Sequence, residues 1–579
     1  MAKLTALESA VTKDVSADEL WKTTSYLSGI ERVSAKEGEY QAVDYLLKKL
    51  AEYGIEREVH EFDAYLSYPI RASLRVLSPT MKEIRAKTRS FGHPTPPEGL
   101  EGEAVWVESK VKGIGFQQLD NQYEGIDVKG KIVITERGGP DGVLDAMKAG
   151  AIAHVHVWPS KEDVIHEMIS TSVWGTPTPE SAVRIPSIPS ISVNNEGGEY
   201  LHNLCGKGLV RIRLTALTDT CWTRERLPVA TIPGTEETEK YFLVGGHLDS
   251  WYVGTTDNAT GNAAMLELAR VLNAQRGKLR RTVKIGWWVG HSYGRYAGST
   301  WYCDANLNDL RKNCVGYMDI DSPGVKGATI YDQITCMSEN WHIAESAITD
   351  VSGGPAVRER PPRAGDYSFY GPGLPSMFML MGNRPMADRF AVGGSGLGWW
   401  WHSEYDTLEW ADKDVLAQDT KIYALAILRV ANSAVLPYRH TPVADELLAT
   451  LKSIDGEVAG RFDFKPVFAA MEVLKKAAQA ADAAIPSIPA EKAAAVNKHI
   501  LTVERTLIPI NYTRCGAFDH DPAHFVPALP LLDDARKLAK LDPKSNDYGF
   551  LLTRLVRSRN LVLAGLETAT EALQAIAAA

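Results

Sequence analysis

Four side chains of the types that bind transition metals stand at the ends of apolar runs in the sequence. His247 comes directly after the run YFLVGG, and Asp257 follows it ten residues later. Asp321 ends the run CVGYMDID, and His402 lies within the segment GWWWHSEYDT. Imidazole nitrogens and carboxylate oxygens are the usual ligands of zinc, manganese and iron in proteins. The pattern therefore predicts a metal site built from His247, Asp257, Asp321 and His402.

Two further carboxylates accompany these residues. Asp249, two residues after His247, could accept the second N–H of the imidazole, as carboxylates often do beside metal-bound histidines. Asp319 precedes Asp321 by two residues in the same run. We expect Asp319 to be a strand-end residue rather than a ligand.

The chain around these residues alternates between strand and helix patterns from residue 226 to residue 440. Apolar runs such as YFLVGG and TVKIGWWVG are separated by segments with helical spacing, including GNAAMLELARVLNAQ and a helix from Ser299 to about Lys312. This alternation predicts an α/β fold, a mostly parallel sheet flanked by helices. Ligands of such sheets gather at the carboxyl ends of the strands, where the predicted metal ligands lie.

Three other regions surround this central part, as expected for a chain of 579 residues. Residues 1–61 have helical spacing and should pack on the central part as an N-terminal segment. Residues 62–225 contain short β-rich runs punctuated by Gly and Pro, which predict a small β-rich domain. Residues 441–579 are helical throughout, with Ala-rich stretches that favour helix.

Composition excludes several classes of partner. The net charge of -9 argues against nucleic acid or an anionic membrane as a partner, and the sequence contains no apolar run long enough to span a bilayer. The first residues lack the apolar core of a signal peptide, and the six cysteines are dispersed. These features predict a cytoplasmic protein with reduced thiols.

The segment GGHLDSWYVGTTDNATGNAAMLELAR resembles the metal-binding stretch of metallopeptidase family twenty-eight, which includes glutamate carboxypeptidase and the transferrin receptor. The step from His247 to Asp257, the strand ending in Asp321 and the segment at His402 follow the family's order, and the resemblance covers nearly the whole chain. It implies a zinc-aminopeptidase-like fold with a protease-associated insert within the β-rich region. It also implies that the helical tail is a dimerisation domain and that the protein is a homodimer.

One motif departs from the family. Family peptidases carry a Glu-Glu pair after the strand that matches TVKIGWWVG, the first acting as general base and the second as a metal ligand. Here the segment reads WWVGHSYGRYAGST, so His291 and Ser292 stand at those positions. Trp401 replaces the Tyr that precedes the last histidine in glutamate carboxypeptidase. The run from Trp399 to Trp401 either lines an aromatic pocket or packs in the core.

The missing carboxylates change the charge of the site. Asp257 and Asp321 are the remaining anionic ligands, and two carboxylates balance one divalent ion rather than two, since an uncompensated buried charge is costly. We therefore expect one metal per chain, with zinc favoured and iron or manganese as alternatives. His402 or His291 would be a further ligand or an acid/base, because an imidazole with a pKa of about 6.5 is suited to proton transfer.

These observations favour a metal-dependent enzyme acting on a small molecule, most simply a hydrolase of an amide or other C–N bond, with catalytic residues His291 and Ser292. Three alternatives stay open. The first is a lyase or an acyl-transferring cyclase. The second is an ordinary peptidase that tolerates the changes. The third is a non-catalytic binding protein resembling the transferrin receptor.

Overall fold

One mixed sheet of twelve strands runs through the computed structural model, which describes residues 4–109, 122–390, 394–523 and 526–579. Four of its strands are parallel neighbours in the order β14 (Ser376–Met377), β11 (Cys314–Asp319), β9 (Glu237–His247) and β10 (Arg281–Trp288). This part confirms the predicted parallel sheet of the central region. Its strands are buried along most of their length, because helices cover both faces.

Two long antiparallel strands join the central part to the β-rich region. β1 (Glu56–Ser78) and β8 (Val210–Ile232) pair along nearly their whole length, and β8 also contacts β10 at one end and β4 (Leu100–Trp106) at the other. These two strands are much longer than the short β-rich runs expected in 62–225, and the predicted limits at 61/62 and 225/226 fall inside them. Both strands alternate buried and exposed residues across those limits, so the sequence pattern contains no break there.

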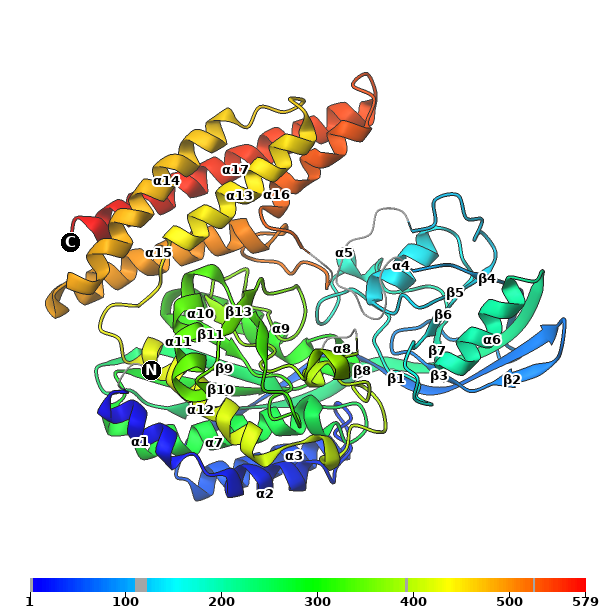
Figure 1. Cartoon of the computed structure of the whole chain (residues 1–579), viewed down its shortest axis with the longest axis horizontal. Helices are drawn as coiled ribbons and strands as arrows, with labels where there is room; N and C mark the ends of the chain where they lie inside the picture. The colour runs from blue at the N-terminus through cyan, green and yellow to red at the C-terminus, as the bar shows by residue number, and fades with distance from the viewer. Residues whose placement is uncertain (1–3, 110–121, 391–393, 524–525) are drawn as a thin grey trace.

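The β-rich region extends the same sheet through β4, β5 (Ile132–Thr135), β6 (Ala153–Val157), β7 (Ser190–Val193) and β3 (Ala86–Thr88), while β2 (Lys82–Ile84) pairs with β1. Its helices are α4 (Pro140–Lys148), α5 (Pro179–Ala182) and α6 (Asn195–Cys205). Residues 110–121 of this region lie outside the described residues. Figure 1 shows the region as a separate lobe beside the central part.

Helices cover the two faces of the central sheet. On one face lie α1 (Ala6–Asp14), α2 (Ala17–Leu27), α3 (Glu37–Glu52), α7 (Thr260–Ala274) and α12 (Lys413–Ala431), and on the other lie α8 (His291–Gly294), α9 (Ala297–Ala305) and α10 (Leu307–Asn313) (Figure 1). α7 is buried almost all round because α2 and α12 pack on it as well as the sheet. The helix predicted from Ser299 to Lys312 is two helices, α9 and α10, which meet at Asn306. α11 (Trp341–Ser352) and a small sheet of β12 (Tyr331–Thr335) and β13 (Ala356–Glu359) complete the central part.

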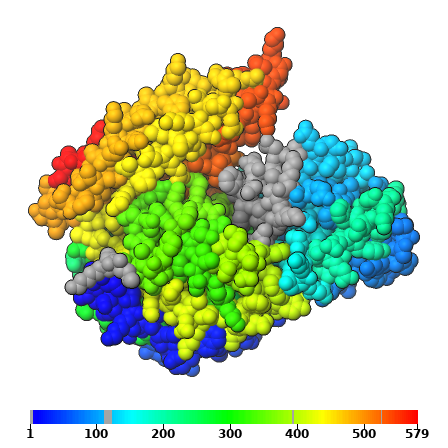
Figure 2. All heavy atoms as spheres, in the orientation of Figure 1, coloured from blue at the N-terminus to red at the C-terminus, as the bar shows by residue number. Residues whose placement is uncertain are grey.

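The helical tail packs beside the central part rather than continuing its sheet. Its main helices are α13 (Thr441–Val458), α14 (Lys465–Ala484), α15 (Ala493–Tyr512) and α17 (Asn546–Ala577), with the short α16 (Pro530–Asp533) between them. Arg505 of α15 anchors the tail, because its guanidinium donates hydrogen bonds to the backbone carbonyls of Arg311 (3.0 Å) and Gly373 (2.5 Å). Figure 2 shows the tail, in yellow to red, and the β-rich region, in cyan, on two sides of the green central part.

None of the helices in the described part of the chain combines the length and apolar character that crossing a bilayer requires.

Candidate metal centre

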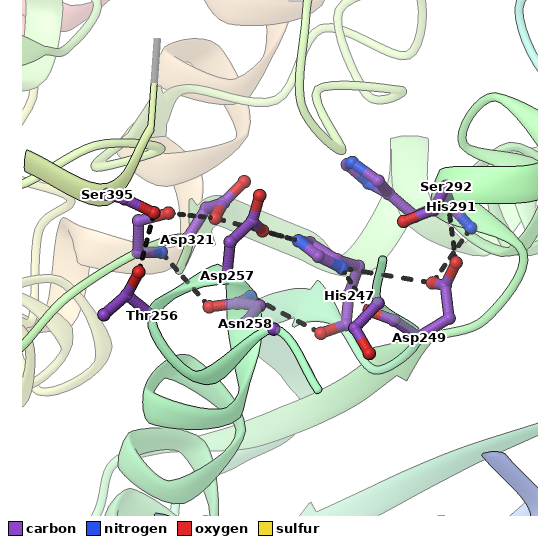
Figure 3. A network of polar contacts seen from close by, with 12 residues as sticks. His247, Asp249, Thr256, Asp257, Asn258, His291, Ser292, Asp321 and Ser395 are labelled. Carbon is purple, nitrogen blue, oxygen red and sulfur yellow. Dashed lines mark hydrogen bonds and ion pairs between the residues drawn. The ribbon is translucent and has the colours of Figure 1, made fainter. Parts of the chain in front are cut away.

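Three neighbouring parallel strands end at the candidate metal centre. His247 is the last residue of β9, and Asp321 lies two residues beyond the end of β11. His291 opens α8, the single turn of helix that follows β10. Because β11, β9 and β10 are adjacent and parallel, their carboxyl ends bring these side chains to one edge of the sheet (Figure 3).

Asp257 joins them from the turn η1 (Thr255–Ala259), which leads into α7. Its Oδ1 lies 2.8 Å from His247 Nε2, and Asp321 Oδ1 lies 3.7 Å from the same nitrogen. One ligand atom from each of His247, His291 and Asp321 lies within 4.8 Å of the others. Donor atoms bound about 2.1 Å from a tetrahedral ion stand about 3.4 Å apart. The distances of Asp257 and Asp321 from His247, 2.8 and 3.7 Å, lie on either side of this value, so these three side chains fit one divalent ion.

The orientation of His247 is set by a backbone group. Its Nδ1 lies 2.8 Å from the backbone carbonyl oxygen of Asp249, which can only accept, so Nδ1 is the protonated nitrogen and Nε2 faces the carboxylates. The prediction assigned this role to the Asp249 carboxylate, whose Oδ1 lies 3.9 Å from Nδ1. The carboxylate turns elsewhere because the backbone N–H groups of His291 (3.1 Å) and Ser292 (2.7 Å) donate to it. It thereby fixes the start of α8 next to His247.

The electrostatics of this group favour a cation. Burial disfavours the charged form of His247, but the carboxylates of Asp321 and Asp257 outweigh burial and raise the pKa of His247 well above its usual value. Burial likewise acts to raise the pKa of Asp257, while hydrogen bonds from His247 and His402 hold that pKa well below its usual value. A proton on His247 thus balances the two acids, and a divalent ion among the same atoms would replace that proton.

The second oxygen of Asp257 has different partners. The indole N–H of Trp401 donates to Oδ2 at 2.5 Å, and His402 Nε2 lies 3.1 Å from the same oxygen. His402 is oriented from the β-rich region, because its Nδ1 donates to the backbone carbonyl of Glu167 (3.0 Å). His402 therefore lies across Asp257 from His247, outside the group formed by His247, His291 and Asp321.

His291 is held by a carboxylate that the sequence analysis did not identify. Its Nδ1 lies 2.9 Å from Asp366 Oδ2, and Asp366 Oδ1 accepts the hydroxyl of Ser299 at 2.7 Å. Asp366 is buried, and its backbone N–H donates to Asp319 Oδ2 (3.1 Å). Burial and the Asp366 carboxylate raise the pKa of Asp319 well above its usual value. Asp319 thus supports the Asp366 loop.

Comparison with known proteins identifies the central part. Residues 229–427 match Peptidase family M28. We refer to this matching part as the M28 domain. A probable glutamate carboxypeptidase of Zea mays is 26% identical over 503 residues, which cover 71% of this chain and 66% of the maize protein. The chain therefore spans less than two thirds of the length of that relative.

Solved structures of similar proteins show the same fold. An M28 peptidase precursor from Shewanella amazonensis aligns with 74% of this chain and 97% of its own at a TM-score of 0.59 and 19% identity. A zinc aminopeptidase from Bacillus subtilis aligns with 71% of this chain and 94% of its own at a TM-score of 0.54 and 18% identity. These comparisons confirm the zinc-aminopeptidase-like α/β fold that the sequence predicted.

A second buried carboxylate positions the loop that carries Asp257 in the M28 domain. Asp406 accepts the backbone N–H of Thr256 (2.9 Å) and of Asp257 (3.0 Å), and also the Thr256 hydroxyl (2.7 Å). Burial raises the pKa of Asp406 to about 7, although these hydrogen bonds favour its charged form. Asp406 belongs to the same HSEYDT segment as His402, so the position of this segment in the sequence was a usable signal.

A small cavity of about 70 Å³ opens at the candidate metal ligands of the M28 domain. Its lining includes Asp257, His291, Arg295, Asp321, Trp401 and His402. Ser292, predicted to be catalytic, is buried and is not among the lining residues. Of the tryptophan run, Trp401 faces this cavity, whereas Trp400 is buried and stacks on Trp410 with ring centroids 3.7 Å apart.

Proposed function

We propose that this protein is a metal-dependent hydrolase that cleaves an amide or other C–N bond of a small molecule and holds one divalent ion, with zinc favoured. The match to Peptidase family M28 supports a metal-dependent, peptidase-like hydrolase. His247, Asp257 and Asp321 would hold the ion, and the small cavity beside them suits a small substrate. A bound divalent ion would act as a Lewis acid toward a carbonyl group and would make water more acidic.

The observation that carries the single-ion proposal is the pair of contacts at Asp257 Oδ2. In a two-ion site this oxygen would bind the second ion together with His402, but here the Trp401 indole already donates to it. α8 also offers Ser292 where a second terminal carboxylate would be needed. A second ion would have to displace the buried hydrogen bond between Trp401 and Asp257. It would also lack a terminal carboxylate to balance its charge.

We assign His291 the role of acid and base. The Asp366 carboxylate favours the tautomer with the proton on Nδ1, which leaves Nε2 to accept a proton from water in the cavity. The same nitrogen can then return the proton to the leaving nitrogen of the substrate. A buried carboxylate behind an imidazole is the arrangement that orients a catalytic histidine and stabilises its charged form. This supports a working enzyme over a non-catalytic scaffold.

Elemental analysis after dialysis should find about one divalent ion per chain. Ser292→Glu alone should leave this value near one, since the Trp401 N–H still occupies Asp257 Oδ2. Ser292→Glu combined with Trp401→Phe should raise it toward two, because the second site then regains a carboxylate and a free oxygen. Two ions in the unmodified protein, each removed by mutating a different histidine, would refute the single-ion site.

A panel of small amides, including N-acyl amino acids, amino acid amides and dipeptides, tests the activity itself. Each compound would be incubated with zinc-loaded protein, and the released amine would be measured. Metal-dependent release from at least one compound is the expected result. A metal-loaded, folded protein that releases no amine from any of them would count against the hydrolase.

We further propose that the helical tail forms a two-fold homodimer. Phe550 and Leu561 of α17 are 72% and 57% exposed, and their spacing of eleven residues places them on the same face of the helix. Light scattering should give twice the chain mass at micromolar concentration, and Phe550→Glu with Leu561→Glu should give a monomer. A monomeric unmodified protein would exclude this assembly.

A further inference from the structure

A cavity of about 640 Å³ lies between α15 of the tail and the amino ends of the central strands, at the opposite edge of the sheet from the candidate metal centre. Its lining includes Lys240 in β9, Arg281 at the start of β10 and Val315 in β11, and α15 contributes side chains between Ala494 and Thr506. β9 continues from Lys240 to His247, a length of about 20 Å at the usual rise of a strand. The cavity is therefore separate from the one that contains the candidate metal ligands.

Basic side chains outnumber acidic ones around this cavity. Two carboxylates line it: Glu237 pairs with Arg281 at 2.9 Å, and Glu239 is exposed. Five further cations line it, and none of them forms an ion pair with a carboxylate in the described part of the chain: Lys240, Arg311, Lys312, Lys498 and Arg505. The cavity therefore carries an excess of positive charge.

Arg311 is the cation with the fewest partners. Its guanidinium forms no hydrogen bond with any residue that the structure describes, and its Nη1 is buried. Its Cζ lies 5.7 Å from the centre of the Phe518 ring, a contact that satisfies none of its N–H groups. An arginine side chain has five N–H donors and stays charged at physiological pH, so a buried donor without an acceptor is costly. An anion in the cavity would remove that cost.

The neighbouring cations are held in place by neutral groups. Lys240 Nζ donates to the backbone carbonyl of Lys312 (2.8 Å) and to Asn313 Oδ1 (3.1 Å). The Arg505 guanidinium donates to backbone carbonyl groups. Burial lowers the pKa of Lys240, and the charges of Lys312 and Arg505 act in the same direction. These contacts fix the positions of the cations without balancing their charge.

One wall of the cavity is aliphatic. Val315, Leu436 and Leu501 belong to its lining, and all three are buried. A ligand with a carbon skeleton would cover this wall and remove apolar surface from water. The cavity therefore suits an organic anion better than an inorganic one.

We propose that this cavity binds a small organic phosphate, whose phosphate group contacts Lys240, Arg311 and Lys312 and whose carbon skeleton covers the aliphatic wall. A phosphate ester carries up to two negative charges and three acceptor oxygens, which suits several cations better than one carboxylate does. The planar guanidinium fork of Arg311 matches two of those oxygens. The site lies outside the metal centre, so this inference does not depend on the proposed hydrolase.

Calorimetric titration tests this inference without relying on turnover. Zinc-loaded protein would be titrated with hexyl phosphate, with inorganic phosphate and with 1-hexanol. We expect hexyl phosphate to bind more tightly than inorganic phosphate and at least about 10-fold more tightly than hexanol, the scale of hydrogen bonds to a charged group. Arg311→Gln should remove the preference over hexanol, and Arg311→Lys should retain part of it. Arg224→Gln, on the exposed face of β8, is the matched control and should leave the preference intact.

A zinc ion can itself bind phosphate, so the same titrations would be repeated after the zinc has been removed with a chelator. The cavity lies a strand's length from the candidate metal ligands, and the preference for hexyl phosphate that depends on Arg311 should therefore be unchanged. Loss of the whole preference with the zinc would show that the phosphate binds at the metal centre and would overturn the inference.

The remaining outcomes are also decisive. Equal binding of hexyl phosphate and hexanol, no binding of either, or a preference that persists in zinc-free Arg311→Gln would overturn the phosphate site. Equal binding of hexyl phosphate and inorganic phosphate would overturn the role of the aliphatic wall. If Arg311→Gln does not fold, Lys312→Gln combined with Lys498→Gln decides in the same way, because both side chains are exposed and their replacement leaves the packing intact.

Discussion

Replacing His291 by alanine is expected to lower turnover by about two to four orders of magnitude, the scale of a positioned acid and base. The reason is the pair formed by His291 Nδ1 and Asp366 Oδ2, which leaves the other ring nitrogen directed to the cavity. Steady-state kinetics on a compound found in the amide panel measures the effect. Asp366→Asn should lower turnover in the same direction but less, because the imidazole remains while its orientation is weakened.

The metal content of the same variants shows whether His291 acts as an acid and base or as a metal ligand. As an acid and base, His291 is not needed to hold the ion, so His291→Ala should keep about one equivalent. Loss of the ion together with the activity would show that His291 is a ligand instead. His93→Ala, an exposed histidine of the β-rich region, provides the control and should retain both activity and metal.

Replacing His247 or Asp321 by alanine is expected to remove the ion and with it all measurable activity. Both side chains contribute ligand atoms to the group at the ends of β9 and β11, and no spare carboxylate lines the cavity beyond Asp257 and Asp321 among the described residues. Elemental analysis should fall from about one equivalent to near zero. Added zinc should stabilise the unmodified protein against heating, by about 2.7 kcal/mol at one hundred times the dissociation constant, and should not stabilise these variants.

Asp319→Asn is the matched control for the ligand variants. Asp319 lies two residues from Asp321 but accepts the backbone N–H of Asp366, a contact that an asparagine oxygen can also make. The variant should therefore keep its ion. Retention of a full equivalent in His247→Ala or Asp321→Ala would show that the ion is held elsewhere.

The candidate metal ligands could be picked out from the sequence because they follow the ends of strands. His247 and Asp321 follow apolar runs that become parallel neighbours, and parallel strands bring their carboxyl ends to one edge. Asp366 and Arg295 had no such signal. Asp366 lies in an irregular loop without apolar periodicity, and Arg295 stands outside the apolar runs that mark the strands.

The residues at which each region begins and ends were harder to predict than the kind of secondary structure it contains. Helical spacing in 441–579 and strand–helix alternation in 226–440 appear as elements of the structure. The β-rich region was predicted to span residues 62–225, but β1 and β8 pass through both limits without a change in their alternating pattern. Sequence periodicity reports the local conformation of a strand, whereas the length over which two strands pair depends on the whole sheet.

The pairing of β1 with β8 has a mechanical consequence. Two regions joined by a flexible linker can swing as rigid bodies, but here both chain connections between the β-rich region and the rest of the protein, β1 and β8, are strands hydrogen-bonded to each other. A hinge motion would have to bend or twist the β1–β8 pair and strain the hydrogen bonds between the two strands. The backbone carbonyl of Glu167 belongs to the β-rich region and accepts a hydrogen bond from His402. The paired strands therefore restrict how far this carbonyl can move relative to His402. The geometry of the metal centre is in this way tied to the curvature of a sheet that extends well beyond it.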